Sequence, residues 1–524
     1  FIHMDGAIYR AFYLAGRNSS PAIGAYRRKS PTPFTDIYSP AVTRYHNHGS
    51  LTVNFDEHLK KSNITAQRIN RNKLIGHVGD STLVPCNNGT EDNGLFLVSE
   101  SFGYRSSMPW QPWHPRFVVD LTGDGRADII GFHENGVNVQ LNRGDGAFEN
   151  ISLALEGQFK HSTEAGGWDI YNHPIFLADV FGNGRPDIVG FANDGVFVAR
   201  NEFVGDGKNF SSSILALKSF GASNGAGGWE FKKHPRFLAD LTGDGRVDII
   251  GFHDDGVHVA LNESTKESAA FKALSVEPIF GGKGVGDWTA KLHPRLVVDL
   301  TGDGCADIIG FGASDVYVAL NDGTGHFRGP KNAVPNFFAI DSTTGSWRVD
   351  RHLRFLSDIT GSGLPDIVGF HDNGVYVARN IGNGMFSPPE LALNEFGYNQ
   401  GWLVERNPRY LVDLTGDGRA DIVGFANGGV FVALNKGNGR FHPPYYILTE
   451  FGAETGDWAV DKNPRLVADL TGTGRADIVG FSNTGVMVGV CFSTFGNRSN
   501  ELASLLKPVF YQDNKHTFFI EPQL

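Results

Sequence analysis

The chain has 524 residues, a length that favours several domains or one repetitive architecture over a single ordinary core. Its formal net charge of −11 argues against a nucleic-acid-binding protein, which would present a basic face. No apolar run approaches the eighteen or so residues of a membrane helix, so we expect no membrane insertion. Cys86, Cys305 and Cys491 are too few and too far apart for a disulfide framework or a CxxC metal site.

The first part of the chain, residues 1–93, is interpreted as a strand-rich N-terminal extension of unknown function. His46, His48 and the Asp-Glu-His run at 56–58 are a weak candidate metal cluster, because their spacing matches no recognised ligand pattern. The chain opens at Phe1 without a signal-peptide pattern, so we interpret it as a fragment or a processed form. Its localisation is unknown, with a secreted or cell-surface-acting role slightly favoured. Seven N-x-S/T sequons permit glycosylation and are weak evidence for secretion: Asn18, Asn63, Asn88, Asn150, Asn209, Asn262 and Asn497.

One glycine-rich acidic phrase, DLTGDGRAD in its fullest form, recurs seven times within residues 94–495. Its first Asp returns every 55 to 61 residues, at Asp120, Asp179, Asp240, Asp299, Asp358, Asp413 and Asp469. The third unit shows the strand patterns RFLAD, DIIGFH and VHVALN, and a fourth strand is predicted around GGWEF. This periodicity predicts an all-β, seven-bladed β-propeller with four antiparallel strands per blade; a β-solenoid is the less favoured alternative.

The order of strands fixes which segments share a face of the predicted disc. If RFLAD is the innermost strand, the acidic loops lie on one face, and the 2–3 turns and the His-Pro-Arg segments lie on the opposite face. The seventh unit has no outer strand of its own after Val490. We predict that residues 94–112 supply it, with 503–522 as the rival, and that the tail 496–524 leads into a further domain.

The acidic loops are candidate Ca²⁺ sites, because glycines let three carboxylates and a carbonyl converge, and hard oxygen ligands suit Ca²⁺. The middle position is Asn183 in the second loop, and Ser362 and Thr473 are poorer ligands in the fifth and seventh. The alternative is a set of Asp/Gly turns whose carboxylates cap backbone amides. The predicted metal ligands are Asp120, Asp124, Asp128, Asp179, Asn183, Asp187, Asp240, Asp244, Asp248, Asp299, Asp303, Asp307, Asp413, Asp417 and Asp421.

The opposite face repeats a Trp, a His or Asn and an Arg. An aromatic plate, a multi-donor Arg and a His or Asn can bind a sugar ring, with its C–H face on the aromatic and its hydroxyls hydrogen-bonded. Three alternatives remain open: the Trp packs between blades, the Arg pairs with an Asp of its own repeat, and the His caps the Pro turn. The predicted sugar-binding residues are Arg116, His133, Trp168, His173, Trp229, His234, Arg236, His253, Trp288, His293, Arg295, Trp347, His352, Arg354, His371, Trp402, Asn407, Arg409, Asn427, Trp458, Asn463 and Arg465.

The unit W-x₄-HPR-[FL]-x₂-DLTGDGRADI[IV]GF-x₃-GV-x-VA-x-N resembles fungal lectins of the Psathyrella velutina lectin family, related to the FG-GAP repeats of integrin propellers. The match covers about 99–495. The resemblance implies Ca²⁺ in some 1–2 loops, and pockets between blades for glycans or glycoproteins with terminal N-acetylglucosamine, with sialic acid as a second ligand. Departures at Ile175, Ala313–Ser314 and Leu353 weaken the prediction for the neighbouring pockets.

The sequence therefore favours a multivalent lectin and not an enzyme, because the carboxylates belong to glycine-rich loops and no nucleophile–base set recurs. Three alternatives are kept. The first is an integrin-like protein-recognition propeller, which should show a large apolar patch on the Trp-bearing face. The second is the receptor-binding module of a larger toxin-like protein, which the ending KPVFYQDNKHTFFIEPQL faintly resembles. The third is a sugar lyase or dehydratase, which would need one unique acid/base or metal site.

Overall fold

The computed structural model describes residues 95–144, 147–160, 168, 172–203, 209–341, 346–456 and 458–489. The predictions for the N-terminal extension, the C-terminal tail, Cys86, Cys491 and the rival closing segment 503–522 lie outside these residues. No helix within the described ranges is long and apolar enough to cross a membrane.

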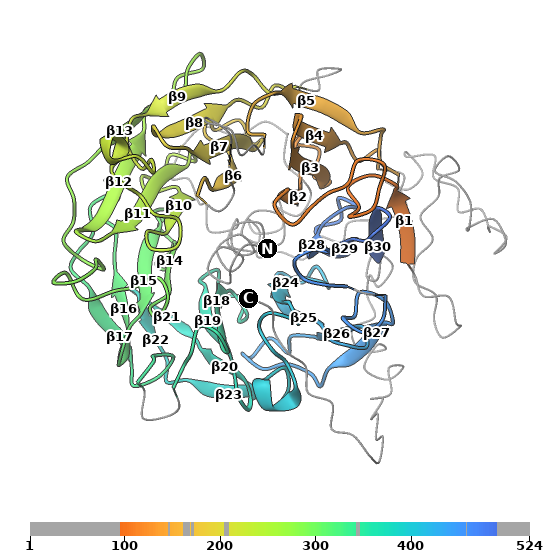
Figure 1. The fold of residues 1–524 in the computed structure, drawn as a ribbon. Helices are drawn as coiled ribbons and strands as arrows, with labels where there is room; N and C mark the ends of the chain where they lie inside the picture. Colours follow the sequence, from red (N-terminus) through yellow and green to blue (C-terminus); the bar gives the residue numbers. More distant parts are fainter. Residues whose placement is uncertain are drawn as a thin grey trace, which may run out of the picture.

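Seven four-stranded antiparallel sheets stand around a common centre, which confirms the seven-bladed propeller (Figure 1). We number the blades one to seven in chain order. Their innermost strands are β2 (Arg116–Val119), β6 (Ile175–Ala178), β10 (Arg236–Ala239), β14 (Arg295–Val298), β18 (Leu353–Ser357), β24 (Arg409–Val412) and β28 (Arg465–Ala468). The second strands are β3 (Asp128–His133), β7 (Asp187–Phe191), β11 (Asp248–His253), β15 (Asp307–Phe311), β19 (Asp366–His371), β25 (Asp421–Phe425) and β29 (Asp477–Phe481).

The outer half of each blade is more exposed than the inner half. The third strands are β4 (Gly136–Gln140), β8 (Val196–Ala199), β12 (Gly256–Asn262), β16 (Asp315–Ala319), β20 (Gly374–Ala378), β26 (Val430–Ala433) and β30 (Val486–Gly489). The outermost strands are β5 (Ser152–Glu156), β9 (Ile214–Leu217), β13 (Phe271–Ala273), β17 (Lys331–Pro335), β23 (Glu390–Leu393), β27 (Tyr445–Leu448) and β1 (Leu95–Ser99). A hairpin of β21 (Asn380–Gly382) and β22 (Met385–Phe386) precedes β23, and the short 3₁₀ helices η4 (Asn224–Ala226) and η5 (Tyr398–Gln400) lie in connections between blades.

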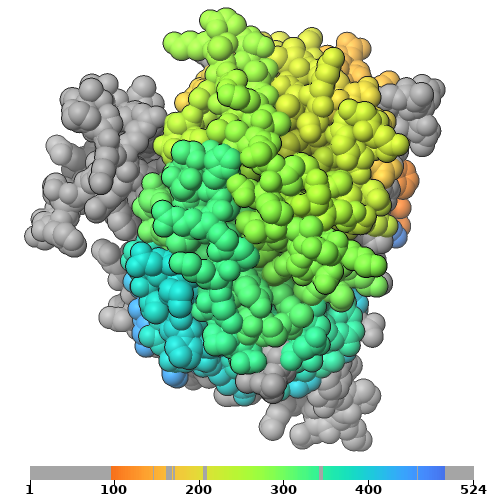
Figure 2. Space-filling view, turned by 90° about the vertical axis from the view of Figure 1, so that its left-hand side faces the viewer, coloured from red at the N-terminus to blue at the C-terminus, as the bar shows by residue number. Residues whose placement is uncertain are grey.

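The hydrophobic core lies between blades and not within them. The second strands repeat the phrase DI[IV]GF and are almost wholly buried, because both faces of each sheet are covered by a neighbouring sheet. One cluster, for example, joins Phe191 of blade two to Leu238 and Ile249 of blade three. Figure 2 shows successive blades in contact along the outer wall, from yellow through green to cyan. Each blade therefore depends on its neighbours for burial.

The ring is closed by the start of the propeller segment, as predicted. Strand β1 pairs antiparallel with β30, from Leu95 opposite Gly489 to Ser99 opposite Val486, and completes blade seven (Figure 1). At the inner side of the same junction, the amide of Ala127 in blade one donates to the carbonyl of Asp469 in blade seven. The closure thus joins the two ends of the propeller by backbone hydrogen bonds.

The predicted fourth strand around GGWEF is wrong. The fourth strand of blade two is β9, and GGWEF at 227–231 lies in the connection that follows it. The outermost strands were hard to detect because they are short and their surroundings vary: Ile214–Leu217 has four apolar residues, of which Ile214 and Leu215 are exposed. The backbone of Trp229 belongs to the connection and not to a strand.

In blades one to six, a buried Asn at or just beyond the end of the third strand joins neighbouring blades at the acidic-loop end. Asn321 donates through Nδ2 to the carbonyl of Ala306 in its own blade (3.0 Å) and to that of Leu241 in the preceding blade (2.8 Å). The same pair of bonds occurs at Asn142, Asn201, Asn262, Asn380 and Asn435. Asn262 was a candidate glycosylation sequon, and its burial and two bonds make it unsuitable as an acceptor.

Candidate functional site

The 2–3 turns and the 4–1 connections meet at one end of the blades, which we call the rim; the acidic loops occupy the opposite end. Each inner strand begins within the His/Asn-Pro-Arg segment or its equivalent and ends at the acidic loop. The predicted separation of these two groups on opposite faces is therefore observed.

The repeated Trp packs over the glycine of the second strand. A Cβ placed on that glycine would lie 2.4 to 2.7 Å from the nearest Trp or Phe ring carbon in every blade, so no side chain other than hydrogen fits there. Each Trp also packs against a Phe, with ring centroids 4.6 to 4.8 Å apart and the rings mostly tilted to each other. Trp110, Trp229, Trp347, Trp402 and Trp458 are buried, whereas Trp168 and Trp288 remain partly exposed.

The stacking Phe has a positive φ, between 50° and 65°, in all seven blades: Phe102, Phe159, Phe220, Phe280, Phe338, Phe396 and Phe451. This left-handed conformation is uncommon for a bulky residue and must be held by its surroundings. In six blades the Arg of the His/Asn-Pro-Arg segment donates to the carbonyl of this Phe at 2.8 to 3.0 Å. Blade two has Ile175 in place of the Arg and keeps the conformation at Phe159, so the Trp stacking suffices there.

These arginines join one blade to the next. Arg236, for example, donates to Phe220 in the connection into its own blade, and its guanidinium lies 5.3 Å from the ring centroid of Phe191 in the preceding blade. Arg116, Arg295, Arg354, Arg409 and Arg465 lie in the same way over the Phe of the blade before, at 5.0 to 5.7 Å. All six are buried and in this arrangement support the rim from below.

The His or Asn of the same segment caps the turn that precedes it, as one alternative held. The Nδ1 atoms of His234, His293 and His352 accept the amide hydrogen of the residue four places earlier, at 3.0 to 3.1 Å. Asn407 and Asn463 use Oδ1 for the same bond. With Nδ1 accepting, the proton of each imidazole lies on Nε2, which faces the 2–3 turn of the same blade.

In most blades the 2–3 turn adds a carboxylate or amide beside the capping His or Asn. His352 Nε2 lies 2.9 Å from Asp372 Oδ1, and His173 Nε2 lies 3.1 Å from Asn193 Oδ1. Asp254 is 3.7 Å from His234 and 50% exposed, so its oxygens face solvent at the rim. Asn427, which has this place in blade six, was predicted, whereas Asp254 and Asp372 were not, although the recurring Glu, Asp or Asn after Phe-His or Phe-Ala in the sequence was a usable signal. Blade four has Ala313 at this place.

In blades one, three and five a histidine of the turn packs against the capping histidine. The ring centroids are 4.2 Å apart for His114 and His133, 4.0 Å for His234 and His253, and 4.1 Å for His352 and His371. Burial and the neighbouring imidazole lower the pKa of His234 to about 4. His234 therefore stays neutral at pH 7.

Replacing His234 by Asn, the residue that Asn407 and Asn463 provide in blades six and seven, is expected to reduce acid sensitivity. Because the folded pKa of His234 lies below the unfolded value, its contribution is complete above pH 6.5 and is lost as the pH falls toward 4. The loss between pH 7 and 4.5 is expected to be about 2 kcal/mol per site. Urea unfolding at several pH values measures it; the reciprocal Asn407→His variant should gain acid sensitivity, and equal pH profiles for all three proteins would refute the assignment.

The acidic loops have one geometry in all seven blades. The first Asp accepts the amide hydrogen of the second Gly at 2.6 to 2.8 Å, and the last Asp accepts that of the residue after the first Asp at 2.8 to 3.1 Å. The loops with Ser362 and Thr473 share these bonds. The backbone-capping alternative is thus observed for the first and last positions.

The loop carboxylates offer the oxygen ligands that Ca²⁺ prefers. Ion pairs with arginines, however, set the orientation of several of them. Asp124, Asp244 and Asp417 form ion pairs with Arg126, Arg246 and Arg419 of their own loops. In the fourth loop Cys305 replaces that arginine, which leaves Asp303 without this ion pair. Burial and neighbouring carboxylates raise the pKa of Asp128, Asp248 and Asp307 to about 7. A cation would relieve this accumulation of negative charge, provided that the middle Asp turned inward.

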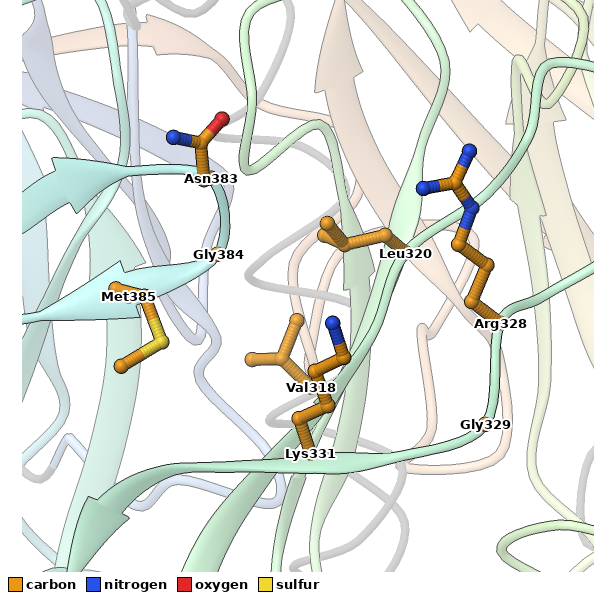
Figure 3. Close-up of a pocket in the computed structure, with 8 residues that line it drawn as sticks. All are labelled: Val318, Leu320, Arg328, Gly329, Lys331, Asn383, Gly384 and Met385. Atoms are coloured by element: carbon orange, nitrogen blue, oxygen red, sulfur yellow. The ribbon is translucent and has the colours of Figure 1, made fainter.

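A shallow recess on the outer wall lies away from the rim. It sits between blades four and five and is lined by Val318, Leu320, Arg328, Gly329, Lys331, Asn383, Gly384 and Met385 (Figure 3). In Figure 3 the turn of the β21–β22 hairpin faces Val318 and Leu320 of blade four across the recess. Its lining belongs to third and fourth strands and their connections, and it contains none of the predicted site residues.

Two segments of the chain, residues 120–190 and 413–480, match the family model of the FG-GAP-like repeat. No curated protein matches the chain. The solved structure of an Agrocybe aegerita lectin, described as specifically recognising non-reducing terminal N-acetylglucosamine, is 41% identical and aligns with 69% of this chain and 87% of its own, with a TM-score of 0.63.

Two weaker similarities concern larger or enzymatic proteins. A Photorhabdus luminescens Tc holotoxin pore is 16% identical, with a TM-score of 0.40 over 75% of this chain and 20% of that one. A Bacillus licheniformis rhamnogalacturonan lyase is 14% identical, with a TM-score of 0.37 over 72% of each chain. At such low identity and poor superposition, neither carries a functional argument.

Fold and repeats together define a seven-bladed propeller built from FG-GAP-like units. Within that class, the identity of 41% over most of the lectin's length is decisive. The chain belongs to the same family as the Agrocybe aegerita lectin.

Proposed function

We propose that the chain is a multivalent lectin that binds glycans or glycoproteins bearing terminal N-acetylglucosamine at its rim. The observation that carries the proposal is the identity of 41% to a lectin described as recognising this sugar, over 87% of that lectin. The finer likeness to the Psathyrella velutina lectins, with sialic acid as a second ligand, belongs to the same proposal.

The polar groups of the rim support a sugar ligand. Asn193, Asp254 and Asp372 offer oxygen lone pairs that accept hydrogen bonds from hydroxyls, and the capping imidazoles His173 and His352 hold Asn193 and Asp372 in place through Nε2. The partly exposed Trp168 and Trp288 offer a ring edge for the apolar face of a sugar. The buried Trp and Arg residues would act indirectly by fixing the connections that carry these groups.

Several weak sites around the ring would together give high avidity for a surface that displays many copies of the sugar. A millimolar site contributes only about −4 kcal/mol. Several such sites on one face, bound to a clustered glycan surface, raise the avidity by about two to four orders of magnitude. Agglutination of cells or particles that display the sugar follows from this arrangement.

The distribution of exposed apolar side chains favours this proposal over protein recognition through an apolar rim. Among the described residues, nine of the ten exposed large apolar side chains belong to the outer wall, including Leu97, Leu153, Ile381 and Tyr446. Leu292 is the one on the rim. An integrin-like contact would require a contiguous apolar patch at the rim.

A glycan array with the full chain tests the proposal. Binding to glycans ending in N-acetylglucosamine, and its competition by the free sugar, is the expected result. A triple variant Asn193→Ala, Asp254→Ala and Asp372→Ala should weaken that binding by at least about tenfold through lost avidity. The control variant Glu202→Ala, Glu263→Ala and Glu390→Ala changes exposed acids of the outer wall and should bind normally. No binding to any glycan, or turnover of a free sugar, would contradict the proposal.

We also propose that Ca²⁺ binds the loops with three carboxylates, most readily the fourth, where Asp303 has no arginine ion pair within its loop. At a concentration ten times the dissociation constant, each occupied site would stabilise the fold by about 1.4 kcal/mol. We expect millimolar Ca²⁺ to raise the unfolding temperature relative to a chelator. Asp303→Ser, which copies Ser362 of the fifth loop, should reduce the increase; identical unfolding curves with Ca²⁺ and with chelator would refute the proposal.

A further inference from the structure

The rim of blade three holds three metal-ligating side chains close together. His253 ends β11, Asp255 lies in the following turn and His258 lies on β12. His258 pairs with Gly251, two residues before His253, so the two imidazoles lie on the same face of the hairpin. The other blades have Asn138, Phe197, Tyr317, Tyr376, Phe431 and Met487 at the position of His258.

The three ligand atoms converge on one point. His253 Nδ1 lies 3.1 Å and His258 Nε2 lies 2.7 Å from the same oxygen, Asp255 Oδ1. All three ligand atoms are within 4.8 Å of one another. Bonds of about 2.0 to 2.1 Å around a tetrahedral Zn²⁺ separate its ligand atoms by about 3.3 Å. Small rotations of these side chains would therefore suffice to admit the ion.

The surroundings of this cluster also suit a cation with an open coordination position. The side chains of His253 and His258 are 21% and 23% exposed, and that of Asp255 is 60% exposed, so a fourth ligand could enter from solvent. Asp254 adds a second carboxylate, and the nearby Lys233 is paired to it. Trp229 packs against both imidazoles, at 5.0 Å from His253 and 5.3 Å from His258, which limits their rotation.

From this geometry we propose that His253, Asp255 and His258 form a site for a divalent transition metal of the zinc class. Two imidazoles and one carboxylate are a ligand set that Zn²⁺ accepts, with water or a ligand oxygen in the fourth position. The site is independent of the acidic loops, which offer oxygen ligands alone. It would also place a metal ion on the face that carries the proposed sugar sites.

A second cluster in blade five provides an internal comparison. His352, His371 and Asp372 also have ligand atoms within 4.8 Å of one another. There, however, Arg351 donates to Asp372 Oδ1 at 2.6 Å, and the side chain of His352 is only 1% exposed. A fixed guanidinium on the carboxylate repels an incoming cation, so this cluster should remain without metal.

The test is isothermal titration of the chelator-treated full chain with Zn²⁺ in sugar-free buffer. We expect His258→Phe, the residue of blades two and six, to lose one equivalent of bound Zn²⁺ relative to the wild type. Histidines elsewhere in the chain contribute equally to both proteins. His371→Ala should retain the wild-type stoichiometry. Co²⁺ should give the intense visible absorption of a tetrahedral site in the wild type and not in His258→Phe.

Asp255→Asn, which copies Asn135 and Asn373 of blades one and five, covers the case in which His258→Phe fails to fold. It removes the charged ligand from an exposed turn and should weaken Zn²⁺ binding at least tenfold. Failure of the wild type to bind Zn²⁺, or equal binding by the wild type and both variants, would overturn the metal site. Because no glycan is present, either result is independent of whether the rim binds N-acetylglucosamine.

Discussion

Replacing Trp347 by Ala is expected to cost about 4 kcal/mol of unfolding free energy, a value typical of a buried Trp truncated in a core. Trp347 is fully buried, stacks 4.8 Å from Phe338 and covers Gly369 so closely that a Cβ there would lie 2.4 Å away. The cavity left by Ala cannot collapse readily, because the backbone beneath it belongs to a paired strand. Urea unfolding of the wild type and the variant measures the difference.

Trp288 supplies the control for this prediction. It has the same place in blade four, but it is partly exposed. Trp288→Ala should therefore destabilise the fold much less than Trp347→Ala, while weakening glycan binding if the exposed ring edge contacts sugar. Equal losses of stability at the two sites would show that burial does not distinguish them, and the division of the tryptophans into supporting and contacting groups would be wrong.

Replacing Asp307 by Ala is expected to destabilise the fold by about 3 to 4 kcal/mol, measured in the presence of chelator. Its two oxygens accept the amide hydrogens of Leu300 and Asn321 at 2.9 and 2.8 Å, and the residue is 1% exposed. Each buried amide left without a partner costs about 1 to 3 kcal/mol. The displaced Asn321 also links this loop to the carbonyl of Leu241 in the preceding blade, so the damage reaches the interface.

Asp303→Ala is the matched control, because Asp303 is exposed and accepts the amide hydrogen of Cys305, two residues on. We expect a loss below about 1 kcal/mol there. If Asp303→Ala without Ca²⁺ were as damaging as Asp307→Ala, the last Asp of the loop would not be the structural anchor that its hydrogen bonds indicate.

The propeller could be predicted from the sequence because its determinants are local and repeated. The acidic phrase fixes the 1–2 loop, the run DI[IV]GF fixes a buried strand, and the missing outer strand after Val490 implied closure by residues near 95. Because each pattern occurs several times, a departure in one unit did not obscure the repeat. The outermost strands could not be predicted in this way, because residues such as Ile214–Leu217 are half-exposed and have no distinctive period.

The rim was harder to predict, because a side chain can bind a ligand only if its polar atoms do not already bond to other residues of the protein. The sequence placed Arg236 and Trp229 on the correct face, but their burial follows from contacts with Phe220 and Phe191 that only the packed blades reveal. A positive φ at Phe220 has no sequence signature for a bulky residue. Conversely, His258 was overlooked, because a His at this place occurs in blade three alone and the search for repeats favours what is shared.

The most direct test of the lectin proposal is the stoichiometry of N-acetylglucosamine binding to the full chain, measured by calorimetry at millimolar sugar. A rim with repeated sites predicts more than one bound sugar per chain, and a loss of sites in the variant Asn193→Ala, Asp254→Ala and Asp372→Ala without loss of folding. A chain that binds no N-acetylglucosamine, or one in which that variant binds as many sugars as the wild type, would contradict the proposed function of the rim.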